Sequence, residues 1–96
     1  MVYLSLQLSQ SFLQQALRAG QFEHLKVRVH DTHLVVYSLE GDEEALRALF
    51  LQLRANRFWL NIASPKGKIQ PTPFIGSVRE LFPILTDKLA FSLVRW

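Results

Sequence analysis

The chain has 96 residues, of which 49% are hydrophobic and 20% are charged, a composition that excludes intrinsic disorder and suits one domain with one hydrophobic core. It contains no cysteine, which excludes disulfide bonds and thiolate metal sites. Its formal net charge of +3 is too modest to mark a nucleic-acid-binding protein by itself. We expect a single domain over residues 1–96, a cytoplasmic location and no membrane-spanning segment or membrane partner.

The first two elements are separated by a change of hydrophobic period. Residues 2–8 alternate apolar and polar side chains, which predicts a half-buried β-strand. The period then lengthens, and Ser9 or Ser11 can cap a helix that runs to about Ala19. Gly20 follows, so we expect a left-handed stop at the end of this helix.

A β-hairpin is predicted next. Residues 25–30 alternate with a period of two, and residues 34–39 begin with an apolar run on both faces. Asp31 and Thr32 make a plausible tight connection between them. Because its first residues are apolar on both faces, we expect the second arm to lie in the centre of a sheet.

A second helix is predicted from Asp42 to a C-cap at Asn56. Three acidic residues in succession, 42–44, suit the positive end of a helix dipole. Apolar residues then follow at i, i+3, i+4 and i+7, over residues 46–53. After Asn56, residues 57–62 alternate again, which predicts another strand.

The remainder begins with a turn signal over residues 64–67, where Pro and Gly occupy the second and fourth positions of a type I turn. A short strand or extended run, residues 68–72, can fold back after it. Pro71 and Pro73 exclude this run from the centre of a sheet.

A last helix is predicted to start at a capping box formed by Ser77 and Glu80. Pro83 should kink or split this helix. Residues 89–96 are a candidate final strand.

The resulting order β-α-β-β-α-β over residues 1–63 matches the ferredoxin-like α+β arrangement, in which two helices cover one face of a four-stranded antiparallel sheet. Residues 64–96 are then a C-terminal extension with a turn, a short helix and the candidate strand. Folds of this kind host many unrelated functions, so the fold does not identify the function.

Charge is segregated along the chain. Residues 1–44 carry three basic and six acidic side chains, whereas residues 45–79 carry six basic and no acidic ones, interleaved with aromatic rings. A field of this kind attracts phosphates, an acidic protein surface, or the acidic half of a second copy.

One hypothesis is therefore single-stranded RNA or DNA binding on a basic and aromatic sheet face, with cations for phosphates and a ring for a base. The residues assigned to it are Arg28, Arg54, Arg57, Trp59, Lys66 and Lys68. The aromatic RNA-binding signature known on such sheets is absent from the sequence.

The second hypothesis is a homodimer that acts by protein–protein binding. The predicted second helix has more apolar surface than one sheet face requires, and the chain ends on apolar residues that suit pairing with a neighbouring chain. The residues assigned to this interface are Leu51, Trp59, Phe91, Leu93 and Trp96. The apolar surplus favours protein over nucleic acid as the partner.

An enzyme is the least favoured reading. His30, Asp31 and His33 lie near a predicted turn, with His24 upstream, but the sequence provides no second ligand cluster and no catalytic spacing. We expect no catalytic residue, no metal site and no cofactor.

Overall fold

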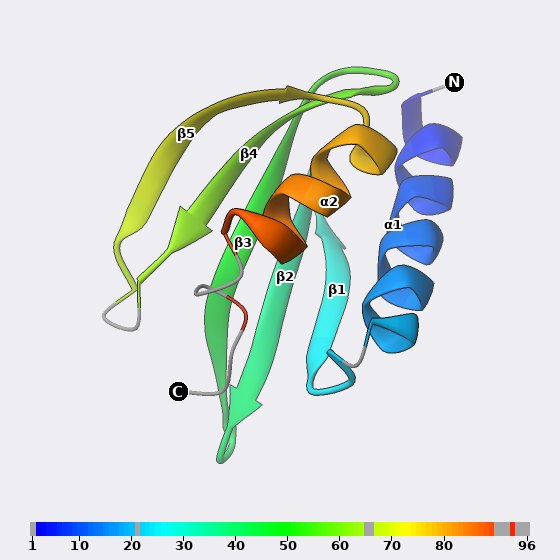
Figure 1. The fold of residues 1–96 in the computed structure, drawn as a ribbon. Coiled ribbons are helices and arrows are strands. Elements are labelled where there is room, and N and C mark those ends of the chain that lie inside the picture. Colours follow the sequence, from blue (N-terminus) through cyan, green and yellow to red (C-terminus); the bar gives the residue numbers. More distant parts are fainter. Residues whose placement is uncertain (1, 21, 65–66, 90–92, 94–96) are drawn as a thin grey trace.

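The computed structural model describes residues 2–20, 22–64, 67–89 and 93, without the side chains of residues 2–5. The elements in chain order are α1 (Val2–Ala19), β1 (Leu25–His30), β2 (His33–Glu40), β3 (Glu43–Arg54), β4 (Arg57–Ala63), β5 (Ile69–Gly76) and α2 (Val78–Asp87). All five strands pair antiparallel in one sheet, in the order β1-β2-β3-β4-β5. Figure 1 shows α1 beside β1 and α2 crossing in front of the sheet.

The expected ferredoxin-like order is therefore wrong. The chain runs helix, five strands, helix, and each strand pairs with the next one along the chain. Residues 69–87 are not an appendage to the fold, because β5 pairs with β4 and α2 contributes Val78, Leu81 and Leu85 to the core.

The strand predicted over residues 2–8 is instead the first half of α1. Leu6 is 1% exposed and Leu8 is 64% exposed, so two leucines that alternation would place on one face lie on different sides of a helix. Leu6 continues the buried stripe of Leu13 and Leu17, at the spacing of a helix. The helix ends at Ala19, as predicted. The left-handed stop predicted at Gly20 is wrong. Among the described residues, the glycines with a positive φ are Gly41 and Gly67.

The helix predicted from Asp42 to Asn56 is also wrong, because residues 43–54 form β3, the central strand. Ala48 and Phe50 pack on the helix side of the sheet, while Leu49 and Leu51 alternate with them and face the other way. A strand with apolar residues on both faces produces a continuous apolar run that also satisfies helical spacing.

Two-residue turns explain why the meander forms. His30 pairs with His33, Glu40 with Glu43 and Arg54 with Arg57, so each connection is a tight hairpin. The predicted hairpin over residues 25–39 is confirmed, and β2 lies between β1 and β3. Asp42 and Asn56 are turn residues, not helix caps. Gly41 has a φ of 67°, a conformation that glycine adopts without strain.

The connection from β4 to α2 follows its local signals. A bond from the Gly67 N–H to the Ser64 carbonyl (2.8 Å) closes the predicted turn, and β5 lies at the sheet edge. The capping box is confirmed by two bonds: the Glu80 N–H donates to Ser77 Oγ at 3.1 Å, and the Ser77 N–H donates to Glu80 Oε1 at 2.9 Å. The helix continues through Pro83 to Asp87 and is not split there.

The described core lies between the sheet and the two helices. Its largest ring side chains are Phe50 and Phe58, both fully buried, and Phe12 of α1 packs edge-on to Phe82 of α2, with ring centroids 6.3 Å apart. No helix within the described residues is long and apolar enough to cross a membrane.

Candidate binding face

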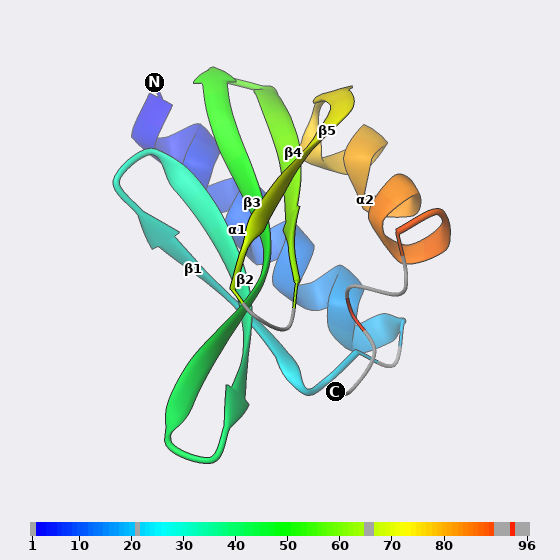
Figure 2. The ribbon, with the colours of Figure 1, turned by 90° about the vertical axis from the view of Figure 1, so that its left-hand side faces the viewer.

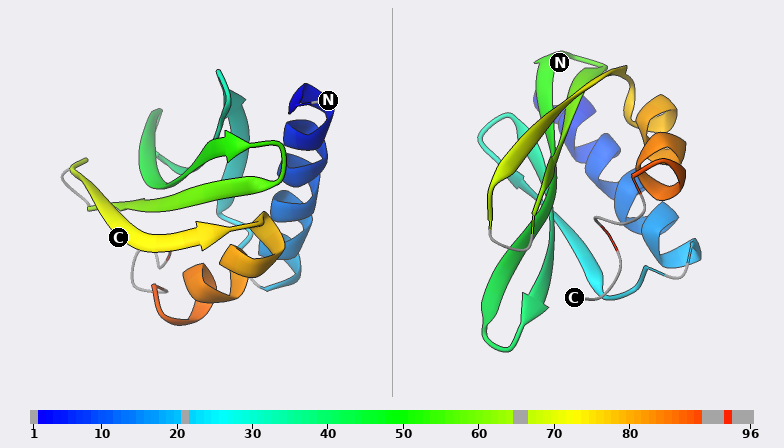
Figure 3. Two further views of the ribbon diagram at one scale, coloured as in Figure 1. Left: turned by 90° about the horizontal axis from the view of Figure 1, so that it is seen from above. Right: turned by 60° about the vertical axis from the view of Figure 1, so that its left-hand side comes forward.

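The sheet has a face turned away from the helices, which we call the open face. Figure 3 (right) shows both helices on one side of the sheet. Pairing registers align the open face in two rows across all five strands. One row is Arg28, Val35, Leu49, Asn61 and Pro71, and the other is His30, His33, Leu51, Trp59 and Ile75. Lys26, Tyr37 and Leu46 form a shorter third row.

The centre of the open face is mostly apolar, apart from Asn61, which is 2% exposed. Leu49, Leu51 and Trp59 are half-buried, and Val35 is only 6% exposed although it is not part of the helix-side core. Ile75 is 47% exposed at the end of the second row. A contiguous apolar surface on a small protein marks an interaction site more often than scattered apolar residues do.

Trp59 is fixed in place on this face. Its indole Nε1–H donates to the carbonyl of Thr72 at 2.7 Å. Thr72 in turn donates its hydroxyl to the Leu60 carbonyl at 2.6 Å. These bonds occur where the register of β5 shifts between the partners of Trp59 and Asn61. A ring held by the sheet loses little conformational entropy when a partner covers it, which suits an interface anchor.

The basic side chains lie at the rim of the open face. Arg28 pairs with Glu44 at 3.0 Å, with side chains 41% and 45% exposed, and its guanidinium lies 5.7 Å from the centroid of the Tyr37 ring. Arg54 and Arg57 face each other across the β3–β4 hairpin. The positive charge is therefore dispersed along the rim, and a carboxylate partly offsets it.

The residues assigned from sequence to an interface separate in space. Leu51 and Trp59 are direct cross-strand neighbours on the open face. Leu93 is fully buried in the core, and its carbonyl accepts a hydrogen bond from the Nε2–H of His24 at 2.8 Å. Phe91 and Trp96 lie outside the described residues.

The residues assigned to nucleic acid also separate. Trp59, Arg28 and Arg57 belong to the open face or its rim, and Arg54 lies at the adjoining hairpin. Lys68 is exposed in the connection before β5. Lys66 lies outside the described residues.

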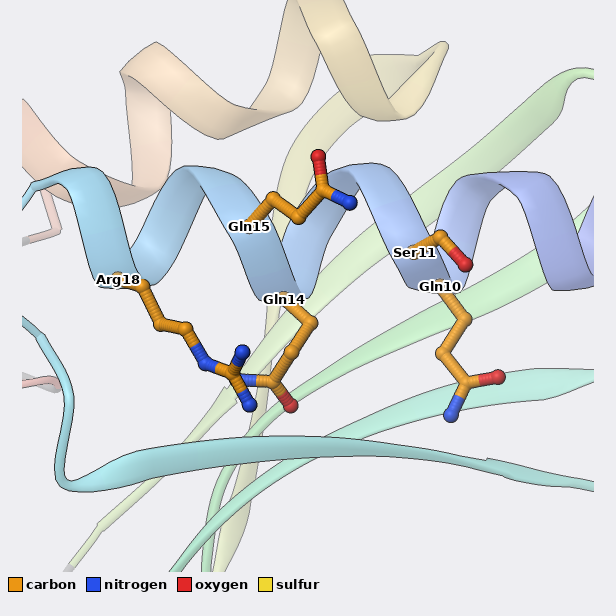
Figure 4. A pocket seen from close by; sticks show the side chains of 5 residues that line it. All are labelled: Gln10, Ser11, Gln14, Gln15 and Arg18. Atoms are coloured by element: carbon orange, nitrogen blue, oxygen red, sulfur yellow. The ribbon is translucent and has the colours of Figure 1, made fainter.

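Two glutamines of α1 cover the outer edge of β1, and we call them the glutamine clamp. Gln14 donates its amide to the Leu25 carbonyl at 3.2 Å and accepts from the Val27 N–H at 2.9 Å. Gln10 donates to the Val27 carbonyl at 3.0 Å. Figure 4 shows both side chains pointing from α1 to β1. The clamp occupies backbone groups that an edge strand otherwise offers to another chain.

The clamp lines a shallow hollow of about 280 Å³ along α1, together with Ser11, Gln15 and Arg18. Sequence reasoning missed the clamp, although its signal is visible: Gln10 and Gln14 are four residues apart, on one side of a helix. Because Gln10 and Gln14 already bind the backbone of β1, we interpret the hollow as part of the contact between α1 and β1 and not as a binding site.

The opposite edge, β5, is closed by different chemistry. Pro71 and Pro73 lie within it, and proline has no N–H to donate to an added strand. Both edges of the sheet are therefore blunted within the described residues. The open face is the part of the sheet that remains available to a partner.

One member of the basic stretch is an interior residue. Arg47 is fully buried at the bulge where the β2–β3 register shifts. Its Nε–H donates to Ser38 Oγ at 3.0 Å, and the Ser38 hydroxyl donates to Glu40 Oε2 at 3.2 Å. Burial lowers the pKa of Arg47 below its ordinary value, and the negative charge of Glu40 offsets this only in part. This arginine contributes to the fold and not to a surface field.

The histidines belong to no cluster of candidate metal ligands among the described residues. His30 and His33 face each other at the first hairpin, and His30 Nε2 lies 3.7 Å from the exposed Asp31 carboxylate. No group of three or more candidate metal ligands occurs within the described part of the chain. Nothing in these residues indicates catalysis.

Comparisons with protein-family models, curated proteins and solved structures found no match to this chain.

Proposed function

We propose that this chain is a non-enzymatic protein-interaction module that forms a homodimer through its open face. The observation that carries the proposal is the group of apolar residues on the side of the sheet away from the helices, in which Leu51 and Trp59 are cross-strand neighbours. The blunted sheet edges support it, because they disfavour assembly by added strands.

The anatomy of the face suits protein recognition. Stable interfaces bury roughly 800 Å² per partner, around an apolar core that is rich in aromatic residues and is surrounded by a polar rim. Here Trp59 supplies an aromatic ring beside Leu51 and Tyr37 supplies one beside Leu46, and charged residues such as Arg28 and Arg57 lie outside them. A cytoplasmic location is also part of the proposal, and the lack of cysteine suits it.

Single-stranded nucleic acid is the competing occupant of the same face. Strong nucleic-acid binding needs a basic groove that follows the backbone. On this face Arg28 is paired with Glu44. Arg47 is buried and bonded to Ser38, so it is not available to a phosphate. Protein is therefore the better-supported partner, and nucleic acid is an outcome of the experiment below.

The experiment is multi-angle light scattering at high-micromolar concentration. We expect a mass about twice the 11.1 kDa of one chain, and a shift to monomer for Leu51→Glu. Leu8→Glu is the matched control, because Leu8 is exposed on α1, and this variant should remain dimeric. A monomeric wild-type chain contradicts the proposal.

A labelled mixed-sequence oligonucleotide is titrated at low salt, where phosphate attraction is strongest. Tight, salt-sensitive binding that Leu51→Glu and Arg57→Glu both weaken would assign the face to nucleic acid instead. We expect no such binding.

A further inference from the structure

We draw no further inference here: the strongest candidate, the acidic tip of the hairpin between β2 and β3 that projects from one end of the sheet (Figure 2), carries nothing, because Glu44 is paired with Arg28, Glu40 accepts a hydrogen bond from Ser38, and no feature of the described residues shows what binds there.

Discussion

Gln14 of the glutamine clamp stabilises the fold through two hydrogen bonds to β1. Gln14→Ala removes the bond to the Leu25 carbonyl and the bond from the Val27 N–H. A net value of about 0.5–1.5 kcal/mol for each bond gives a loss of about 2 kcal/mol in the free energy of unfolding. Gln15→Ala is the matched control, because Gln15 is exposed on the same helix and the change of helix propensity is identical.

Urea unfolding followed by circular dichroism measures the difference at one fixed chain concentration, since a dimer's stability depends on concentration. With a slope of about 1 kcal/mol per molar urea, the midpoint of Gln14→Ala should fall by about 2 M relative to Gln15→Ala. The melting temperature should fall by roughly 8–16 °C. Equal midpoints for the two variants would refute the clamp as a stabilising contact.

Three further predictions concern the turns, the last helix and the core. Gly41→Ala should lose about 1 kcal/mol of stability from backbone strain alone, because φ is 67° and no heavy atom beyond the two adjacent residues lies within 4 Å of the added methyl group. Gly41→Asn should lose less, and unchanged urea midpoints for both variants would contradict the turn conformation. The Ser77 backbone N–H, and next the Ser77 side chain, lower the pKa of Glu80 below its usual value. The capping box should therefore stabilise the fold above the ordinary pKa and lose that effect as the pH falls through the lowered one. An NMR titration of Glu80 should show the depressed pKa, partly restored in Ser77→Ala, whereas identical titrations would disprove the side chain's part. Phe58 is fully buried, and Phe58→Ala should cost about 3–5 kcal/mol by urea unfolding; a loss under 1 kcal/mol would mean that the core is not packed as described.

Local signals in the sequence predicted those elements whose structure is decided locally. The hairpin over residues 25–39 and the capping box at Ser77 depend on neighbours in the chain, and both were predicted correctly. Pro71 and Pro73 predicted an edge position for the strand that contains them, because proline lacks the backbone N–H that a central strand needs.

The two segments whose secondary structure was predicted wrongly share a cause. Residues 2–8 and 43–54 have apolar patterns that fit either period, so burial in the finished fold decides between them. Residues 43–54 are rich in Glu, Ala, Leu and Arg, which favour helix, yet pairing with β2 and β4 on both sides makes this segment the central strand. Tertiary contacts outweigh propensity there.

The candidate site was only partly accessible from sequence. Leu51 was singled out as surplus apolar surface on a predicted helix; it lies instead on the open face of a strand, beside Trp59. The sequence shows that Leu51 is apolar beyond what the core requires. Which residues lie next to it depends on the strand register, which the sequence does not show. The clamp of Gln10 and Gln14 and the burial of Arg47 join segments distant in sequence, so they emerge only with the fold.

The most direct test of the central claim is an isotope-filtered NOE measurement on a mixture of labelled and unlabelled wild-type chains. It detects only proton pairs that lie on different molecules. The account predicts intermolecular contacts from the methyl groups of Leu46, Leu49 and Leu51 and from the ring of Trp59. Intermolecular contacts confined to α1 or α2, or none at high-micromolar concentration, would contradict it.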